Sequence, residues 1–257
     1  AFPAGWALIE HRVHGRTLFD CGYGAPARDA MRRGLRRVYR AVVGACCPPH
    51  GDAAALLAAR GIEPGSIGRV VISHFHPDHI GGLAAFSAAR FTAHSDAWRC
   101  VQRGPISRMH AQIWTELLPA DFAGRLDLVD ANGFATAPAE LAAFQRSFDL
   151  FGDGSVQLVE LPGHASGQLG VALQTGGART LLVADACWQS DQLGRPRRLP
   201  WLARTLATHD HAGYADTLER IRRFQRDNPD AWVIPAHCSK TLDAWSARHP
   251  HSVLRVG

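Results

Sequence analysis

Three histidines and one aspartate lie within six positions of residues 73–82, SHFHPDHIGG. Alternate residues of an extended chain point to the same side, so His74 and His76 can bind one metal ion together. Asp78 and His79 come on the following turn, displaced sideways, and can serve a second ion. The chain has 14 histidines, so some clustering arises by chance. We interpret this tight spacing as a metal site.

The residues before this motif predict how it is positioned. Residues 69–72, RVVI, form a short β-branched run that predicts a buried strand, and the histidines begin where that strand should end. In α/β folds, sites are built just past the strand ends. His164, Asp185 and His237 each follow a further apolar run of this kind. We therefore expect four strands to deliver a histidine or an aspartate to the same edge.

The rest of the chain predicts further strands and helices. Strands are expected at residues 6–11, 16–20, 91–94, 156–161, 169–174, 180–184 and 232–237, and helices at 52–60 and 214–226. Residues 97–148, rich in Ala, Leu, Phe and Trp, predict a long and mostly helical insertion. Residues 188–213 predict a loop over the site, either a lid that selects the substrate or a plain surface connection.

Five arginines cluster early in the chain, on a segment that predicts an amphipathic helix. They are Arg32, Arg33, Arg36, Arg37 and Arg40, and the apolar Met31, Leu35, Val38 and Val42 recur among them at near-helical spacing. We interpret the basic residues as a solvated helix face. No aromatic platform or recognised binding motif accompanies them in the sequence, so no nucleic-acid partner is expected.

Length and composition favour one large domain over residues 1–257. Hydrophobic residues make up 46% of the 257-residue chain, and no window approaches the ~18 consecutive apolar residues of a membrane span, so we expect no membrane partner. The net charge of +5 is carried by arginine, because Lys240 is the only lysine. The sequence starts without Met and without a charged leader, so we expect a cytoplasmic protein, with a processed secreted form as the alternative.

Six cysteines show no C-x-x-C spacing, and in a domain of this size they predict mostly buried free thiols. Cys187 and Cys238 each neighbour a candidate metal ligand, so a thiolate ligand at these positions is an alternative. The histidines and aspartates suffice without it.

The order and spacing of the candidate ligands resemble those of the metallo-β-lactamase-fold hydrolases. The matching elements are the motif H-x-H-x-D-H at residues 74–79, Pro-Gly-His164, Ala-Asp185 and Pro-Ala-His237, and they span nearly the whole chain. The resemblance implies an α/β fold, the αβ/βα four-layer sandwich of two mixed β-sheets with outer helices. It also implies a dinuclear metal centre at one edge of the sandwich.

The same resemblance implies a role for each site residue. His74, His76 and His164 would hold the first ion, and Asp78, His79 and His237 the second, with Asp185 bridging the two. Asp20, in the glycine-rich turn DCGYG, matches the acid that supports the metal loop from behind the ligands. Asp78 and Asp185 are the candidate catalytic carboxylates.

Imidazole and carboxylate ligands predict the metal and the chemistry. They suit zinc, and iron or manganese would also accept them. Two such ions ~3.5–4 Å apart can hold a hydroxide between them and polarise a carbonyl or phosphoryl oxygen. Metal-bound water titrates near ~7, so no serine or cysteine nucleophile is needed at neutral pH. The sequence has no competing Gly-x-Ser-x-Gly element, and hydrolysis is the expected reaction class.

The sequence differs from several branches of the metallo-β-lactamase-fold hydrolases, and the branch that it resembles most is the N-acyl-homoserine lactonases. His79 argues against the commonest class B β-lactamases, and His76 against the flavodiiron oxidoreductases, which carry Glu there. The 85 residues from His79 to His164 are too many for glyoxalase II types, and no RNA-binding arm indicates a tRNA-processing nuclease. Residues 8–11, 18–22, 150–156 and 161–164 resemble stretches of the lactonases.

Two departures from that group concern the substrate. The lactonases carry a tyrosine three residues after the bridging Asp, where this chain has Trp188, whose indole donates one hydrogen bond but cannot act as an acid. Residues 165–168, ASGQ, replace a common second Gly-His with Gly-Gln. An acid for the leaving alkoxide would then come from Tyr214, His209 or His211.

The sequence therefore predicts a hydrolase that opens a lactone or ester of a small acyl substrate, with a homodimer as one expected assembly. Three alternatives stay open. They are an acyl-thioesterase, a small-nucleotide phosphodiesterase that uses the arginines at 195–198, and a signal-binding protein with a weakly active centre.

Overall fold

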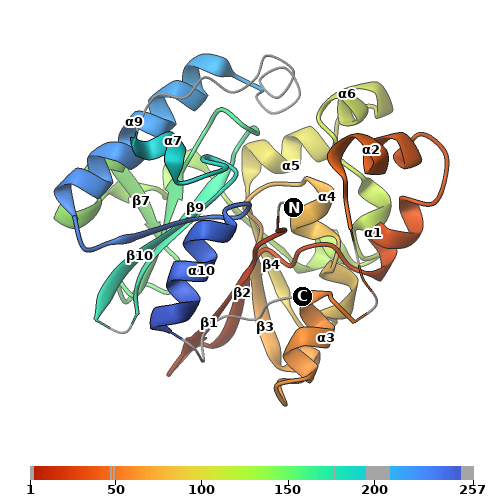
Figure 1. Ribbon diagram of the computed structural model, residues 1–257, viewed down its shortest axis with the longest axis horizontal. Coiled ribbons are helices and arrows are strands. Elements are labelled where there is room, and N and C mark those ends of the chain that lie inside the picture. The colour runs from red at the N-terminus through yellow and green to blue at the C-terminus, as the bar shows by residue number, and fades with distance from the viewer. Residues whose placement is uncertain (1–2, 47, 49, 176, 195–208, 250–257) are drawn as a thin grey trace.

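Two mixed β-sheets lie face to face in the computed structural model, with helices on their outer sides (Figure 1). The structure describes residues 3–46, 48, 50–175, 177–194 and 209–249. Within these ranges no helix is both long and apolar enough to cross a lipid bilayer. The layering of helices, sheet, sheet and helices is the predicted αβ/βα sandwich, which is confirmed.

The first sheet is built from the N-terminal half of the chain, in the order β1-β2-β3-β4-β5. β1 and β2 form an antiparallel hairpin, and the later strands continue in parallel. The strands are β1 (Ala7–His11), β2 (Gly15–Phe19), β3 (Ile67–Val71), β4 (Arg90–His94) and β5 (Leu126–Val129).

The second sheet follows in the order β11-β10-β9-β8-β7-β6. Its neighbours pair antiparallel except for β10 and β11, which run parallel. The strands are β6 (Ala135–Thr136), β7 (Arg146–Asp149), β8 (Val156–Glu160), β9 (Leu169–Thr175), β10 (Ala178–Ala184) and β11 (Trp232–Pro235).

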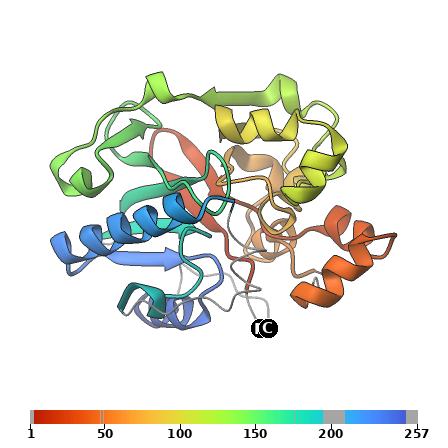
Figure 2. The ribbon, with the colours of Figure 1, turned by 90° about the horizontal axis from the view of Figure 1, so that it is seen from above.

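Helices cover the outer face of each sheet (Figures 1 and 2). Those beside the first sheet are α1 (Ala25–Ala30), α2 (Arg36–Val43), α3 (Ala53–Ala58), α4 (Pro77–Ile80), α5 (Ser95–Val101) and α6 (Pro105–His110). The second sheet is accompanied by α7 (Asp191–Gly194), α9 (His211–Asp227) and α10 (Ser239–Arg248). α3 starts at its predicted position because the Asp52 side chain caps it by accepting the Ala55 N–H at 2.9 Å.

Both faces of the central strands are buried. In β3, Val70 packs in the layer below the outer helices, whereas Val71 packs between the two sheets. In β10, Leu181 and Leu182 divide in the same way. Successive side chains of a strand point to opposite faces, so a strand covered on both sides is apolar at every position. This explains the short unbroken apolar runs at residues 70–72, 181–184 and 232–235, whereas β8 also contains Gln157 and Glu160.

The mostly helical insertion predicted at residues 97–148 is wrong in part. The segment contains α6 and most of α5, but it also supplies β5 to the first sheet and then β6 and β7 to the second. The runs in β5 and β7 are four residues each, too short for a helical period to be told from a strand period. The segment therefore belongs to the sandwich and carries the chain from one sheet to the other.

The amphipathic helix predicted around the arginine cluster is also corrected. The chain turns at residues 31–35, where Gly34 has a φ of 50°, and this turn separates α1 from α2. None of the residues of α2 is buried. The apolar side chains of the predicted helix lie at the surface, apart from Met31.

The predicted loop over the site, residues 188–213, falls largely outside the described residues. Its described parts are α7 with the residues before it, and residues 209–213, where α9 begins.

Replacement of Leu158 by alanine should destabilise the protein substantially. Leu158 is fully buried between the sheets, and truncation there leaves a cavity that costs ~2–5 kcal/mol of unfolding free energy. Urea denaturation of Leu158→Ala measures this loss. Leu128→Ala is the matched control, because Leu128 is 48% exposed and should change stability by less than about 0.5 kcal/mol. Equal losses in the two variants would contradict the assignment of the core.

Candidate metal centre

Four strands end at one edge of the sandwich and deliver the predicted ligands there. β3 is followed by the loop that carries His74 and His76, and β8 is followed by His164. Asp185 comes directly after β10, and His237 shortly after the parallel β11. The seven predicted ligands form two groups whose ligand atoms lie within 4.8 Å of one another. The ends of these four strands therefore meet at one edge of the sandwich, as expected.

The first group consists of three imidazoles. His74 Nε2 lies 3.0 Å from His76 Nδ1, and His164 Nε2 lies 3.1 Å from the same atom. His74 is fully buried and His164 is nearly so. Burial and the neighbouring rings lower the pKa of His74 and of His76 well below the ordinary value. Both rings are therefore neutral near pH 7, which is the state in which imidazole binds a metal.

The second group contains Asp78, His79, Asp185 and His237. Asp185 Oδ1 lies 3.2 Å from His79 Nε2, and Asp185 Oδ2 lies 3.1 Å from His237 Nε2. Asp185 Oδ2 also lies 3.4 Å from His164 Nε2 in the first group. Asp78 Oδ2 completes the second group at 3.4 Å from His237 Nε2. The Asp185 carboxylate thus contacts both groups, and the His79 ring also lies against His74, with centroids 4.1 Å apart.

Two buried polar atoms of this cluster lack hydrogen-bond partners within the described part of the chain, and this bears on whether a metal ion fits. His79 Nε2 and Asp185 Oδ1 are buried, and neither has a hydrogen-bond partner among the described residues. A buried polar atom without a partner costs about 1–3 kcal/mol, so such atoms in native proteins call for an explanation. A cation between them would satisfy both. The nitrogen and oxygen donors suit zinc, iron or manganese, and the residues fit a divalent metal.

Asp20 lies behind the candidate ligands and forms hydrogen bonds with residues of the motif. Its Oδ1 accepts the Ser73 N–H at 2.8 Å, and its Oδ2 accepts both the Ser73 hydroxyl at 2.8 Å and His79 Nδ1–H at 2.7 Å. Because the Ser73 hydroxyl donates to Asp20, it accepts from His74 Nδ1–H at 2.9 Å. Both rings therefore turn their Nε2 atoms toward the site.

Two of these supporting groups could not be found from the sequence. His237 Nδ1–H donates to the Pro3 carbonyl at 2.5 Å, a contact across 234 positions of the chain. No spacing signal connects two residues so far apart. Ser73 stands inside the motif, yet its hydroxyl has a role only because Asp20 lies beside it.

Trp188 lies over the cluster. Its ring centroid is 6.2 Å from that of His164 and 6.1 Å from that of His237. The indole Nε1 atom is buried and makes no hydrogen bond with any residue that the structure describes. Trp188 thus offers an unused donor beside the two metal groups.

The three predicted acids differ in their surroundings. The hydroxyl of Tyr214 is buried, and burial raises its pKa well above the ordinary value, so it is a poor acid at neutral pH. His209 and His211 are exposed at the start of α9. The His209 backbone N–H donates to the His164 carbonyl at 3.2 Å, which places this segment beside a ligand.

The cysteines next to the ligands belong to neither group. Burial raises the pKa of Cys187 to about 12. Burial also opposes ionisation of Cys238, but hydrogen bonds from Ser190 and Thr241 outweigh it and lower the pKa of this thiol. Thr241 Oγ1 donates to Cys238 Sγ at 3.2 Å, so that sulfur is occupied within the fold. Among the described cysteines, four of five are buried and all are free.

A third group of possible ligands joins the β1–β2 hairpin to the loop before β8. His11 Nε2 lies 3.2 Å and His14 Nε2 3.6 Å from Asp153 Oδ2. His11 Nδ1 accepts the backbone N–H groups of Val13 and His14, both at 3.1 Å. Since Nδ1 is an acceptor, the ring proton sits on Nε2 and faces Asp153. This arrangement suits a histidine–carboxylate contact between the two sheets better than a metal.

Comparison with known proteins assigns the family. The sequence matches the Metallo-beta-lactamase superfamily over residues 5–237. The chain belongs to the metallo-β-lactamase superfamily. The predicted family, with the prediction of an enzyme, is confirmed.

Among relatives, the chain is 29% identical to a probable metallo-hydrolase of Mycobacterium tuberculosis over 237 residues, which cover 90% of this chain and 73% of that protein. It is 30% identical to the N-acyl homoserine lactonase AttM of Azorhizobium caulinodans over 242 residues, covering 90% and 83%. It is 29% identical to the N-acyl homoserine lactonase AiiB of Agrobacterium fabrum over 174 residues. That match covers 64% of this chain and spans about half, 54%, of AiiB.

A solved N-acyl homoserine lactone hydrolase, with the product N-hexanoyl-L-homoserine at its catalytic metal centre, matches with a TM-score of 0.66 at 15% identity and covers 95% and 94% of the two chains. A probable metal-dependent hydrolase from Staphylococcus aureus matches with a TM-score of 0.66 at 17% identity, covering 90% and 73%. These likenesses concern the fold.

Removal of the Asp20 carboxylate charge should weaken metal binding. Asp20→Asn loses the acceptor that orients His79, and loss of such an outer partner typically costs ~10–100-fold in metal affinity. Competition with a chromophoric zinc chelator measures the change. Asp153→Asn is the control, since the described partners of Asp153 are His11, His14 and Ser155, none of which belongs to the two groups. If Asp153→Asn loses as much metal as Asp20→Asn, the assignment of the two groups is contradicted.

Metal uptake should release protons. In the metal-free protein, burial favours neutral rings, but Asp185 outweighs it and raises the pKa of His237 to about 9 and that of His79 well above the ordinary value. Both rings are protonated at pH 7.5 and must lose a proton to bind a metal, so affinity should fall as the pH drops. Calorimetric titration with zinc in buffers of different ionisation enthalpy measures the release. Binding heats that do not depend on the buffer would contradict this expectation.

Proposed function

We propose that this protein is a dinuclear metal-dependent hydrolase that opens the lactone ring of N-acyl-homoserine lactone-like substrates. The observation that carries the proposal is the pair of ligand groups sharing Asp185. His74, His76 and His164 would hold one ion, and Asp78, His79 and His237 the other, with Asp185 binding both. When bound, two divalent ions polarise a carbonyl oxygen and make a hydroxide nucleophile available at neutral pH. Zinc suits the donor set, as do iron and manganese.

Side chains of this chain would position the substrate and move the proton. The Asp78 side chain is 13% exposed and its Oδ2 lies beside His237, so solvent and substrate reach this carboxylate. In the proposed mechanism hydroxide forms a bond to the lactone carbonyl carbon, Asp78 takes the proton that this oxygen gives up, and passes it to the alkoxide released when the ring C–O bond breaks. Trp188 would donate its free indole N–H to an oxygen of the substrate and hold it over the two groups.

The relatives favour the lactone over other substrates. AttM and AiiB are named as N-acyl homoserine lactonases, and the AttM match extends over most of both chains. The phosphodiesterase alternative depends on arginines at 195–198, which lie outside the described residues. An acyl-thioesterase would use the same ligand groups and the same Trp188 donor, so substrate assays must separate the two.

Ring opening of N-acyl-homoserine lactones tests the proposal. The protein, loaded with two measured equivalents of zinc, is given short- and long-chain lactones, and acid release is followed with a pH indicator. Asp185→Asn is the control, because it removes the carboxylate that contacts both groups. Turnover that the control loses supports the lactonase. No turnover of any lactone at full metal occupancy, with hydrolysis of acyl-thioesters, would replace it with a thioesterase.

Trp188→Phe should reduce activity without changing metal content. Phenylalanine keeps an aromatic ring beside His164 and His237 but lacks the N–H. A lost neutral hydrogen bond of ~1 kcal/mol corresponds to roughly a fivefold fall in kcat/KM. Steady-state kinetics and metal analysis of Trp188→Phe measure both quantities, and Trp188→His, which restores a donor, is the rescue variant. Unchanged kcat/KM in Trp188→Phe would exclude the hydrogen bond.

A further inference from the structure

The surface of α2 and the turn before it expose a stripe of apolar side chains. Leu35, Val38 and Val42 are 77%, 58% and 63% exposed. They recur at i, i+3 and i+7, so they lie along one side of the helix. Single exposed apolar residues are ordinary, but a contiguous stripe on a water-facing helix indicates an interaction surface.

The same segment is strongly cationic. Residues 30–51 contain five arginines and no aspartate or glutamate. Arg36 is held within the fold, because it pairs with Glu116 and lies over the Trp114 ring at 4.9 Å. Arg32 pairs with Asp29 at 3.7 Å, whereas the guanidinium groups of Arg33, Arg37 and Arg40 have no ion pair or hydrogen bond with any part of the chain that the structure describes. Their positive charge is therefore available to a partner.

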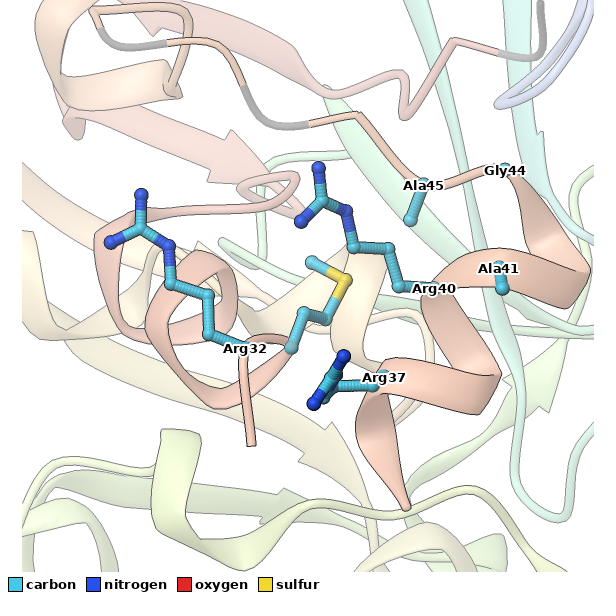
Figure 3. A pocket seen from close by; sticks show the side chains of 7 residues that line it. Arg32, Arg37, Arg40, Ala41, Gly44 and Ala45 are labelled. Atoms are coloured by element: carbon cyan, nitrogen blue, oxygen red, sulfur yellow. The ribbon is translucent and has the colours of Figure 1, made fainter. Parts of the chain in front are cut away.

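Three of the arginines surround a hollow between α1 and α2. Figure 3 shows the side chains of Arg32, Arg37 and Arg40 around it. The hollow has a volume of about 640 Å³, and its lining is completed by Met31, Ala41, Gly44 and Ala45. Guanidinium groups present a planar fork of donors that matches the oxygens of a phosphate. The hollow therefore fits a phosphate-bearing group.

α2 is attached to the body of the protein along its other side. The Tyr39 ring packs edge-on against Trp114 with centroids 4.9 Å apart, and its hydroxyl lies 3.2 Å from that of Tyr23. Together with Arg36, this contact holds the helix in place. The apolar stripe and the hollow thus flank the part of the helix that faces away from the protein.

We propose that this face, residues 32–45, docks on an anionic phospholipid surface. Lipid phosphates would occupy the arginine hollow, and Leu35, Val38 and Val42 would enter the boundary between headgroups and acyl chains. A basic helix with an apolar side binds a bilayer interface by these two contributions together. The inference does not depend on which reaction the metal centre performs.

Charge argues for a lipid rather than a second copy of the chain. A two-fold interface would place the same arginines opposite one another, and this segment has no carboxylate to compensate them. A soluble phosphate would explain the hollow but would leave the apolar stripe in water. An anionic bilayer offers both an array of phosphates and an apolar layer.

Co-sedimentation of the full-length, metal-loaded protein with vesicles tests the proposal. The probes are vesicles of phosphatidylcholine alone and vesicles with 30% phosphatidylglycerol, at 50 mM and 500 mM NaCl. We expect binding to the phosphatidylglycerol vesicles at low salt, weak binding at high salt, and little binding to phosphatidylcholine.

Two pairs of substitutions separate this face from general charge. Arg37→Ala with Arg40→Ala should lower the partition coefficient about fivefold for each arginine, roughly 25-fold together. Arg223→Ala with Arg226→Ala removes the same charge from α9 and should leave binding almost unchanged. Val38→Ser with Val42→Ser should also weaken binding, whereas Val13→Ser, at an 80% exposed residue on the β1–β2 turn, should not.

Four outcomes would overturn the proposal. The first is equal binding to both kinds of vesicle, or to neither, and the second is equal loss in the α2 and α9 variants. The third is release from vesicles by millimolar inorganic phosphate but not by chloride of matched ionic strength, which would indicate a soluble-anion site. The fourth is a dimer in light scattering that Val38→Ser with Val42→Ser dissociates, without vesicle binding, which would assign the face to a second copy.

Discussion

The buried carboxylate of Asp185 among three imidazoles is the interaction on which the site depends. Burial alone would raise its pKa, but His237 and His79 hold the pKa of this carboxyl well below the ordinary value. A buried charge is tolerated only where partners compensate it, and here those partners come from three other places in the chain. The sandwich edge must therefore bring β3, β8, β10 and β11 to the same end, and departures from that geometry would leave a charge unpaired.

Hydrogen bonds to the Nδ1 atoms of the histidines orient these rings within the site. Ser73 binds Nδ1 of His74, Asp20 binds that of His79, and the Pro3 carbonyl binds that of His237, which leaves the Nε2 atoms for the two ligand groups. Two non-glycine residues at this edge have positive φ, Asp20 at 58° and Ala184 at 45°. Such conformations cost of order 1–3 kcal/mol and are retained where surrounding structure holds them. Asp20 itself orients His79, and Ala184 directly precedes Asp185, whose carboxylate contacts both groups.

The metal centre and the α2 face belong to different layers of the molecule. The centre draws its ligands from loops at the ends of both sheets, whereas α2 lies outside the first sheet and is held by Tyr39 and Arg36. Residues 111–116 connect the two regions, since the Ala111 backbone contacts His76 and Trp114 contacts α2. The proposed chemistry and the proposed docking would therefore use separate side chains.

The sequence by itself indicated the candidate ligands and the strands that carry them, because H-x-H-x-D-H and three later acid or histidine positions each follow a mainly apolar segment. Tertiary structure decided what local patterns cannot encode. It placed Pro3 against His237 and Ser73 between Asp20 and His74, and it turned the four-residue runs of β5 and β7 into strands. It also left the apolar side of α2 exposed to solvent, although apolar residues at helical spacing usually pack against a core. Period and spacing report which face of an element is apolar, but what covers that face, and which distant group meets a ring nitrogen, depends on how the sheets pack.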